Sequence, residues 1–142
     1  MNQKPLTISL IVLLILPVIC LAGNIEIGDI KLKWEKDFGT PCTLLAKIPA
    51  INCTDKDYSI RGKFLFYDKD GFELCKIPFW GEVKAREGEV LQVSGWVTDW
   101  DYEETASLKV TIETKPSDWL GVKAEPLIFE RELRLPLRDV RE

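Results

Sequence analysis

The fold class of this chain can be read from residues 64–74, Phe64-Leu65-Phe66-Tyr67-Asp68-Lys69-Asp70-Gly71-Phe72-Glu73-Leu74. The segment predicts a strand, a tight turn and a second strand. Phe64 and Phe66 share one face of an extended chain, so we expect both rings in the core. Tyr67 has the opposite parity and can keep its hydroxyl in water. Asp68 can accept hydrogen bonds from nearby backbone, and Gly71 tolerates a positive φ, so both suit a hairpin turn.

The rest of the chain continues this pattern. Seven segments have the alternation of a strand, namely residues 25–34, 43–51, 59–67, 73–80, 90–97, 106–114 and 127–137. A parity change at Gly28-Asp29 predicts an irregularity in the first. Pro49 and Pro136 each predict a bend, an edge position or a strand end. Short strands separated by turns predict an all-β protein, a seven-stranded immunoglobulin-like antiparallel β-sandwich.

The first 22 residues have the features of a secretory signal peptide. Lys4 precedes an almost wholly apolar run, and the small residues Cys20 and Ala22 precede Gly23. We therefore expect cleavage after Ala22 and one mature domain over residues 23–142, in a secreted or periplasmic protein. Two membrane-attached alternatives remain open. The segment could stay uncleaved, since its length is near the lower limit for crossing a bilayer, or Cys20 could carry a lipid.

The composition argues against several classes of function. The chain has no histidine and a formal net charge of −4, with 23 acidic and 19 basic residues. It therefore lacks the usual general base at neutral pH and every histidine-containing metal site. No basic cluster is present, which argues against nucleic acid as a partner. We expect a protein that is not an enzyme and that uses no cofactor and no metal.

Residues 64–71 also resemble the motif of a known family. The FxLYD family has Phe, any residue, Leu, Tyr and Asp, followed by a turn that contains glycine. Here Phe66 stands where leucine is usual, and the likeness extends over about residues 46–112. Family members are small exported β-sandwich domains, mostly bacterial and archaeal. The resemblance implies the same fold and supplies no active site, so the motif residues are expected to be structural, namely Phe64, Phe66, Tyr67, Asp68 and Gly71.

Three cysteines follow the expected cleavage point, and export favours one disulfide among them. A bond from Cys53 to either of the others would have to span the length of a strand. Cys42 and Cys75 belong to the same end of the sandwich and have core-facing parity. We predict a Cys42–Cys75 disulfide, with Cys53 left in the polar loop, although the other pairings stay open.

Two short motifs have simpler explanations. Asn52-Cys53-Thr54 matches the glycosylation acceptor pattern, which is common by chance. The acids of residues 68–73 match part of a calcium loop, but a hairpin turn accounts for each of them.

The least ordinary segment is residues 96–104, Trp96-Val97-Thr98-Asp99-Trp100-Asp101-Tyr102-Glu103-Glu104. It places three aromatic side chains among four carboxylates, a combination that suits a protein contact or a sugar-stacking platform. The candidate binding surface is therefore Trp96, Asp99, Trp100, Asp101 and Tyr102. The alternative is a long hairpin loop whose rings fold onto the end of the sandwich. The acidic run near Glu103 could also form one helical turn.

These observations predict an exported, non-enzymatic module of the cell envelope or periplasm. It would act by binding an envelope protein or glycan. One alternative is a carbohydrate hydrolase that uses two carboxylates facing each other across a cleft. The other is a structural subunit that pairs through an edge strand.

Overall fold

The structure is a computed structural model that describes residues 24–36, 41–117 and 127–136. The predicted signal peptide lies outside these residues. The described chain forms β1 (Ile25–Ile27), β2 (Lys31–Glu35), β3 (Cys42–Asn52), β4 (Tyr58–Tyr67), β5 (Glu73–Val83), β6 (Gly88–Val97), α2 (Asp99–Glu104), β7 (Ser107–Pro116) and β8 (Leu127–Leu133). No helix within these ranges has the length and apolar character needed to cross a membrane.

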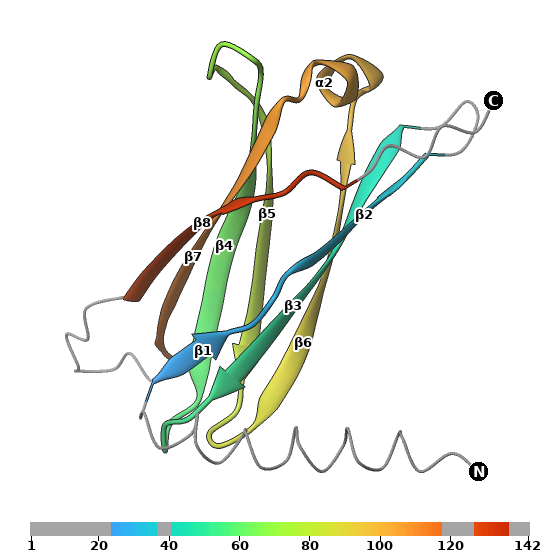
Figure 1. The fold of residues 1–142 in the computed structure, drawn as a ribbon. Helices are drawn as coiled ribbons and strands as arrows, with labels where there is room; N and C mark the ends of the chain where they lie inside the picture. The colour runs from blue at the N-terminus through green and yellow to red at the C-terminus, as the bar shows by residue number, and fades with distance from the viewer. Residues whose placement is uncertain (1–23, 37–40, 118–126, 137–142) are drawn as a thin grey trace, which may run out of the picture.

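Two antiparallel sheets pack face to face (Figure 1). In the first sheet, β3 lies between β6 on one side and β1 and β2 on the other. The second sheet has the order β5-β4-β7-β8. The predicted immunoglobulin-like sandwich is confirmed. The fourth strand of a constant-type immunoglobulin domain belongs to the first sheet, whereas β5 here pairs with β4 in the second.

Two ends of the sandwich are named below. The α2 end holds α2, the turn between β4 and β5, and the start of β3, and it is uppermost in Figure 1. The Asn52 end holds the loop of residues 52–57 and the turn of residues 84–87 between β5 and β6.

The predicted irregularity near Gly28 separates β1 from β2, and it lies beside Pro49 of β3. The Gly28 N–H donates to the Pro49 carbonyl over 2.9 Å. In an antiparallel sheet, the nitrogen and the carbonyl of one residue face the same neighbouring strand. The Pro49 nitrogen therefore points at the break between β1 and β2, where no backbone donor is needed. The sequence predicts that Pro49 bends its strand, ends it or lies in an edge strand. It instead lies within the central strand, because the gap in the flanking strand accommodates it.

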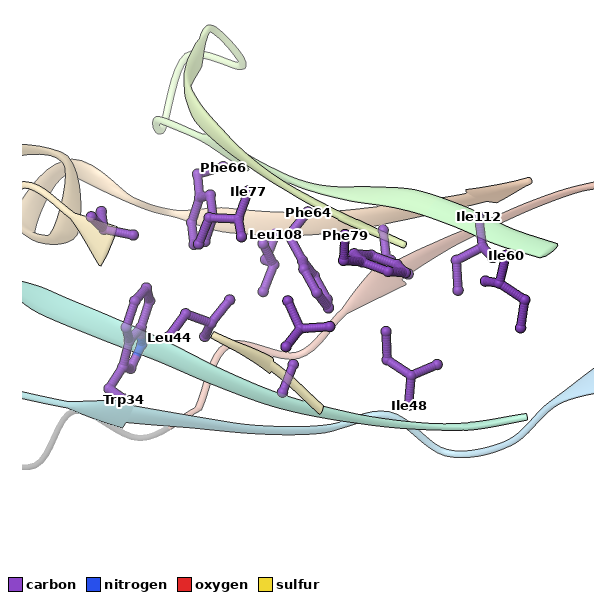
Figure 2. Close-up of a cluster of buried hydrophobic side chains, with 14 of the residues drawn as sticks. Trp34, Leu44, Ile48, Ile60, Phe64, Phe66, Ile77, Phe79, Leu108 and Ile112 are labelled. Atoms are coloured by element: carbon purple, nitrogen blue, oxygen red, sulfur yellow. The ribbon is translucent and has the colours of Figure 1, made fainter. Parts of the chain in front are cut away.

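The core lies between the sheets, and Phe64 and Phe66 are at its centre. Both rings are fully buried, as predicted. Figure 2 shows them with Phe79 and Leu108 from the second sheet, above Leu44 and Ile48 of β3. The Phe64 and Phe79 ring centroids are 5.2 Å apart. Removing such a ring typically costs about 3–5 kcal/mol of stability, so β4 contributes a large share of the packing energy of the core.

The turn of the opening segment forms as its residues predict. Asp68 Oδ1 accepts hydrogen bonds of 2.9 Å from the N–H groups of Asp70 and Phe72. The Gly71 N–H donates to the Asp68 carbonyl over 3.1 Å. Gly71 has a φ of 85°, a conformation in which a side chain would be strained. Asp68 and Gly71 therefore close the hairpin, and the carboxylate of Asp68 has a structural role in the turn.

The Asn52 end is held by a buried side chain. Asn52 has no exposed surface. Its Nδ2 donates to the carbonyls of Lys56 (2.7 Å) and Val83 (2.9 Å). Its Oδ1 accepts from the Thr54 N–H (2.9 Å) and the Thr54 hydroxyl (2.7 Å). The acceptor pattern at Asn52 thus has a structural role, because a buried amide with both donors engaged is closed to a glycosylating enzyme.

The chain also enters at the Asn52 end. The Cys53 N–H donates to the Asn24 carbonyl over 3.0 Å, which fixes the first described residue beside the loop. Arg86 adopts a positive φ of 63° in the neighbouring turn, and its guanidinium donates to the Cys53 carbonyl over 3.2 Å. Hydrogen bonds therefore tie the start of the chain, the loop and the turn together.

Candidate binding surface at the α2 end

The segment after β6 forms a short capped helix. Thr98 is the N-cap of α2, and its hydroxyl accepts from the Asp101 N–H over 3.1 Å. The Tyr102 N–H donates to the Thr98 carbonyl over 2.9 Å. Asp99 and Asp101 lie in the first turn, where carboxylates interact favourably with the positive end of the helix dipole. The single helical turn expected near Glu103 is present in place of a long open loop.

Tyr102 does not belong to the exposed surface, so this part of the prediction is wrong. Its side chain is only 8% exposed, and its ring meets Trp34 edge to face at a centroid distance of 5.0 Å. Lys36 Nζ lies over the ring, 5.1 Å from its centroid. Two residues along a helix correspond to a rotation of about 200°, so Tyr102 faces the core when Trp100 faces water. Tyr102 therefore anchors α2 to the sandwich.

Trp96 and Trp100 are exposed, as the candidate surface requires. The exposed fractions are 79% for Trp96 and 71% for Trp100. Trp96 points to the outer face of the first sheet opposite Thr43, while its neighbour Val97 points inward. Rings of this size on ordered backbone offer a large contact area at low cost in conformational entropy. The two tryptophans are the part of the prediction on which a binding surface can be built.

A further exposed aromatic residue lies at the same end and was not predicted as a site residue. Phe72 is 71% exposed and follows Gly71 in the turn between β4 and β5. Its position between a turn glycine and a strand could have indicated exposure, because the strand alternation has not yet begun there.

The carboxylates of α2 come from one element. Asp99 pairs with Lys36 Nζ at 3.3 Å. Asp99, Glu103 and Glu104 are exposed, and Asp101 is half-buried. A glycosidase needs two carboxylates that flank the substrate from facing positions, and six consecutive residues of one helix do not supply two facing elements. Among the described residues, no group of three or more acidic or cysteine side chains could hold a metal.

The predicted Cys42–Cys75 disulfide is absent, and both residues are free thiols. Cys42 is in the central strand of the first sheet, and Cys75 is in edge strand β5 of the second. The two cysteines therefore come from different sheets and from strands that do not pair with each other. Cys53, expected in a polar loop, has its side chain buried.

The cysteine environments disfavour thiol chemistry. Burial raises the pKa of Cys75 to about 11, and the charges of Asp101 and Glu73 act in the same direction. Burial also raises the pKa of Cys42, with Lys36 opposing the shift and Asp99 adding to it. Thiols with raised pKa values stay protonated at neutral pH and are poor nucleophiles. Both side chains therefore serve as small apolar groups in or beside the core.

Another tryptophan lies on the outer face of the second sheet. Trp80 is 81% exposed and borders a hollow of about 370 Å³. The hollow lies over the small side chain of Ser59, and longer side chains line it, those of Arg61, Trp80, Glu82, Glu113 and Lys115. Glu82 is engaged by Lys84 Nζ at 2.7 Å and by the Ser117 hydroxyl at 3.3 Å. Trp80 matches Trp96 in exposure and lies on the opposite sheet, so it provides a control.

The architecture defines an immunoglobulin-like β-sandwich. A crystal structure of a protein from Archaeoglobus fulgidus is similar to this chain, with a TM-score of 0.48 and 13% sequence identity over 80% of this chain and 100% of that one. No protein-family model and no curated protein matches the sequence. The FxLYD resemblance therefore stays a prediction.

Proposed function

We propose that this protein is an exported, non-enzymatic binding module of the cell envelope or periplasm, and that Trp96 and Trp100 form its working surface. The observation that carries the proposal is the exposure of both rings at one end of the sandwich. Exposed tryptophans on ordered backbone are frequent anchors of protein interfaces. The partner is an envelope protein or a glycan with an apolar face.

The support for the tryptophans is rigid. Trp96 is held by the β3–β6 ladder, in which it pairs with Thr43. Trp100 lies on a helix fixed by the Thr98 cap on one side and by the buried Tyr102 on the other. A preformed surface loses little conformational entropy on binding. The acidic side chains around Trp100 add a preference for a partner that offers hydrogen-bond donors or positive charge.

The test compares matched tryptophan variants. The purified protein is used as bait for an envelope extract and, in parallel, for a panel of immobilised polysaccharides. Trp96→Ala and Trp100→Ala should each reduce the captured partner about tenfold or more, since anchors of this kind contribute about 2 kcal/mol or more. Trp80→Ala removes an equally exposed ring from the other sheet and should leave capture unchanged.

Two results would contradict the proposal. Equal loss with Trp80→Ala would show that capture depends on exposed aromatic area in general. Release of reducing sugar from any polysaccharide of the panel, abolished by Asp101→Asn, would favour the hydrolase alternative instead.

A further inference from the structure

Edge strand β6 lacks the features that keep sheet edges from pairing with another chain. It has ten residues and is bonded only to β3 among the described strands. Its sequence, Gly-Glu-Val-Leu-Gln-Val-Ser-Gly-Trp-Val, contains one charge, no lysine and no proline. Natural edge strands of this length are normally blunted by charges, proline, bulges or breaks. An unprotected edge of ten residues therefore indicates a partner strand.

The other edges of the sandwich do have such protection. β5 carries Lys76 and Pro78, and proline in an edge strand keeps its nitrogen on the open side. β8 carries three consecutive charged residues, Glu130, Arg131 and Glu132. The edge formed by β1 and β2 is broken near Gly28. The contrast singles out β6.

The hydrogen bonds of β3 identify the backbone groups that β6 leaves open. The Pro49 carbonyl faces Gly28, and the Asn52 N–H donates to the Glu87 carbonyl. Even-numbered residues of β3 therefore face β6, and they pair with odd-numbered residues such as Val93 and Val97. Because bonding direction alternates along a strand, the even-numbered residues of β6 turn their N–H and carbonyl groups to the open edge. These residues are Gly88, Val90, Gln92, Ser94 and Trp96.

The side chains of these residues match a second copy of the same strand. In antiparallel pairing centred on Val93, Val90 lies opposite Trp96 of the second copy, and Gln92 lies opposite Ser94. Val90 and Trp96 are the exposed large apolar side chains of β6, with exposed fractions of 52% and 79%. Moving the centre to residue 92 or 94 would place each of them opposite a small or polar residue. The register centred on Val93 pairs apolar with apolar and polar with polar.

We propose that β6 is a homodimerisation edge, at which two copies join antiparallel about a two-fold axis through Val93. Each facing pair of even-numbered residues exchanges two backbone hydrogen bonds, about eight in all. The two first sheets then form one continuous sheet, and the interface is isologous. Trp96 gains Val90 of the second copy beside it and keeps its ring on the outer face. The α2 ends of the two copies lie at opposite ends of the dimer.

A charge-pattern experiment tests the pairing and its register. Gln92 and Ser94 are exposed, so changing them leaves the core intact. Gln92→Glu with Ser94→Glu places carboxylates opposite each other twice and should raise the dissociation constant about tenfold. Gln92→Glu with Ser94→Lys places opposite charges at the same positions and should lower it. Sedimentation equilibrium of the full chain, in a detergent matched to the solvent density, measures all three proteins.

Cysteine crosslinking provides a second readout that does not depend on the N-terminal segment. Val93→Cys meets its own copy at a non-hydrogen-bonded pair, where Cβ atoms approach to about 4.5–5.5 Å and a disulfide can form. Gln92→Cys is the matched control, because its opposite residue is Ser94. Oxidised Val93→Cys should give a covalent dimer, and Gln92→Cys and wild type should not.

Each contrary result overturns the proposal. A wild-type chain that sediments as a monomer, including one that pairs only with a different protein, excludes homodimerisation. A Glu/Glu variant as dimeric as wild type excludes β6 as the interface. Crosslinking of Gln92→Cys as fast as Val93→Cys excludes the register. Trp100→Ala should not change the dimer, so loss of partner capture and loss of dimerisation can be told apart.

Discussion

The two ends of the sandwich differ in the side chains that they bury and expose. At the Asn52 end, a fully buried amide makes four hydrogen bonds, three within the loop and one to Val83 at the end of β5. At the α2 end, Phe72, Trp96 and Trp100 are each more than two-thirds exposed. Buried polar groups contribute stability only when they are satisfied, whereas exposed aromatic rings contribute almost none. The difference indicates that one end holds the fold together and the other end is available for contact.

The largest effect is expected at Asn52. Asn52→Ala removes both amide donors and the acceptor, and it leaves the buried Val83 carbonyl without that donor. Unsatisfied buried groups cost about 1–3 kcal/mol each, so we expect a loss of about 3 kcal/mol in the free energy of unfolding. Urea denaturation measures it. Thr54→Ala removes only the hydroxyl and should cost about 1 kcal/mol. Equal losses in the two variants would contradict the central role of Asn52.

The anchor of α2 should matter less. Tyr102→Leu retains apolar volume but loses the edge-to-face contact with Trp34 and the cation–π contact with Lys36. We expect a loss of about 2 kcal/mol. Trp100→Ala on the same helix should change stability by less than about 0.5 kcal/mol. The unfolding temperatures of the two variants compare the buried ring with the exposed one. A larger loss of stability for Trp100→Ala than for Tyr102→Leu would contradict the assignment of Tyr102 as the anchor of α2.

The hairpin turn at the α2 end should contribute a smaller amount. Asp68→Ala removes the acceptor of two backbone hydrogen bonds in an exposed turn. Water can replace an exposed acceptor, so the expected loss is about 1 kcal/mol. Asp68→Asn retains a side-chain carbonyl oxygen and should recover most of it. A loss above about 3 kcal/mol, measured by urea denaturation, would mean that the turn also controls the packing of Phe64 and Phe66.

The smallest effect is the acid sensitivity of the Asn52 end. The Ala85 N–H donates to Asp57 over 2.9 Å, and with Lys84 it holds the pKa of this carboxyl below its ordinary value of 3.8. A lowered folded-state pKa contributes stability above the unfolded-state pKa, and this is lost as pH falls through the folded-state value. Unfolding between pH 5 and pH 2 should therefore be steeper in wild type than in Asp57→Asn. Identical profiles would exclude Asp57 as a contributor.

Much of the architecture could be predicted from the sequence, because alternation determines which residues face the core. The burial of Phe64 and Phe66, the break near Gly28 and the turn at Gly71 all follow from local patterns. Pro49 could not be placed from its own strand. Its tolerance in a central position depends on the gap between β1 and β2, which is a property of the neighbouring strand.

The candidate site could be predicted only in part. Trp96 was correctly expected at the surface, since strand alternation continues through it. Tyr102 was not placed correctly, because one turn of helix rotates it towards the core. The burial of Asn52 was also not predicted, because a polar residue in a loop is usually exposed. The partners of its amide lie up to 31 residues away in the sequence, beyond any local pattern.

The hydrogen bond between Cys53 and Asn24 determines at which end of the domain the preceding chain attaches. It fixes the point at which the chain enters the domain at the Asn52 end. Whatever precedes residue 24 therefore attaches there, and the strands of about ten residues place the α2 end about 30 Å further out. If the N-terminal segment holds a single copy at a membrane, Trp96 and Trp100 of that copy lie at the far tip and face away from the lipid, whereas a second copy paired antiparallel at β6 has the reverse orientation. The domain then acts as a short stalk whose reach is set by the length of its own strands.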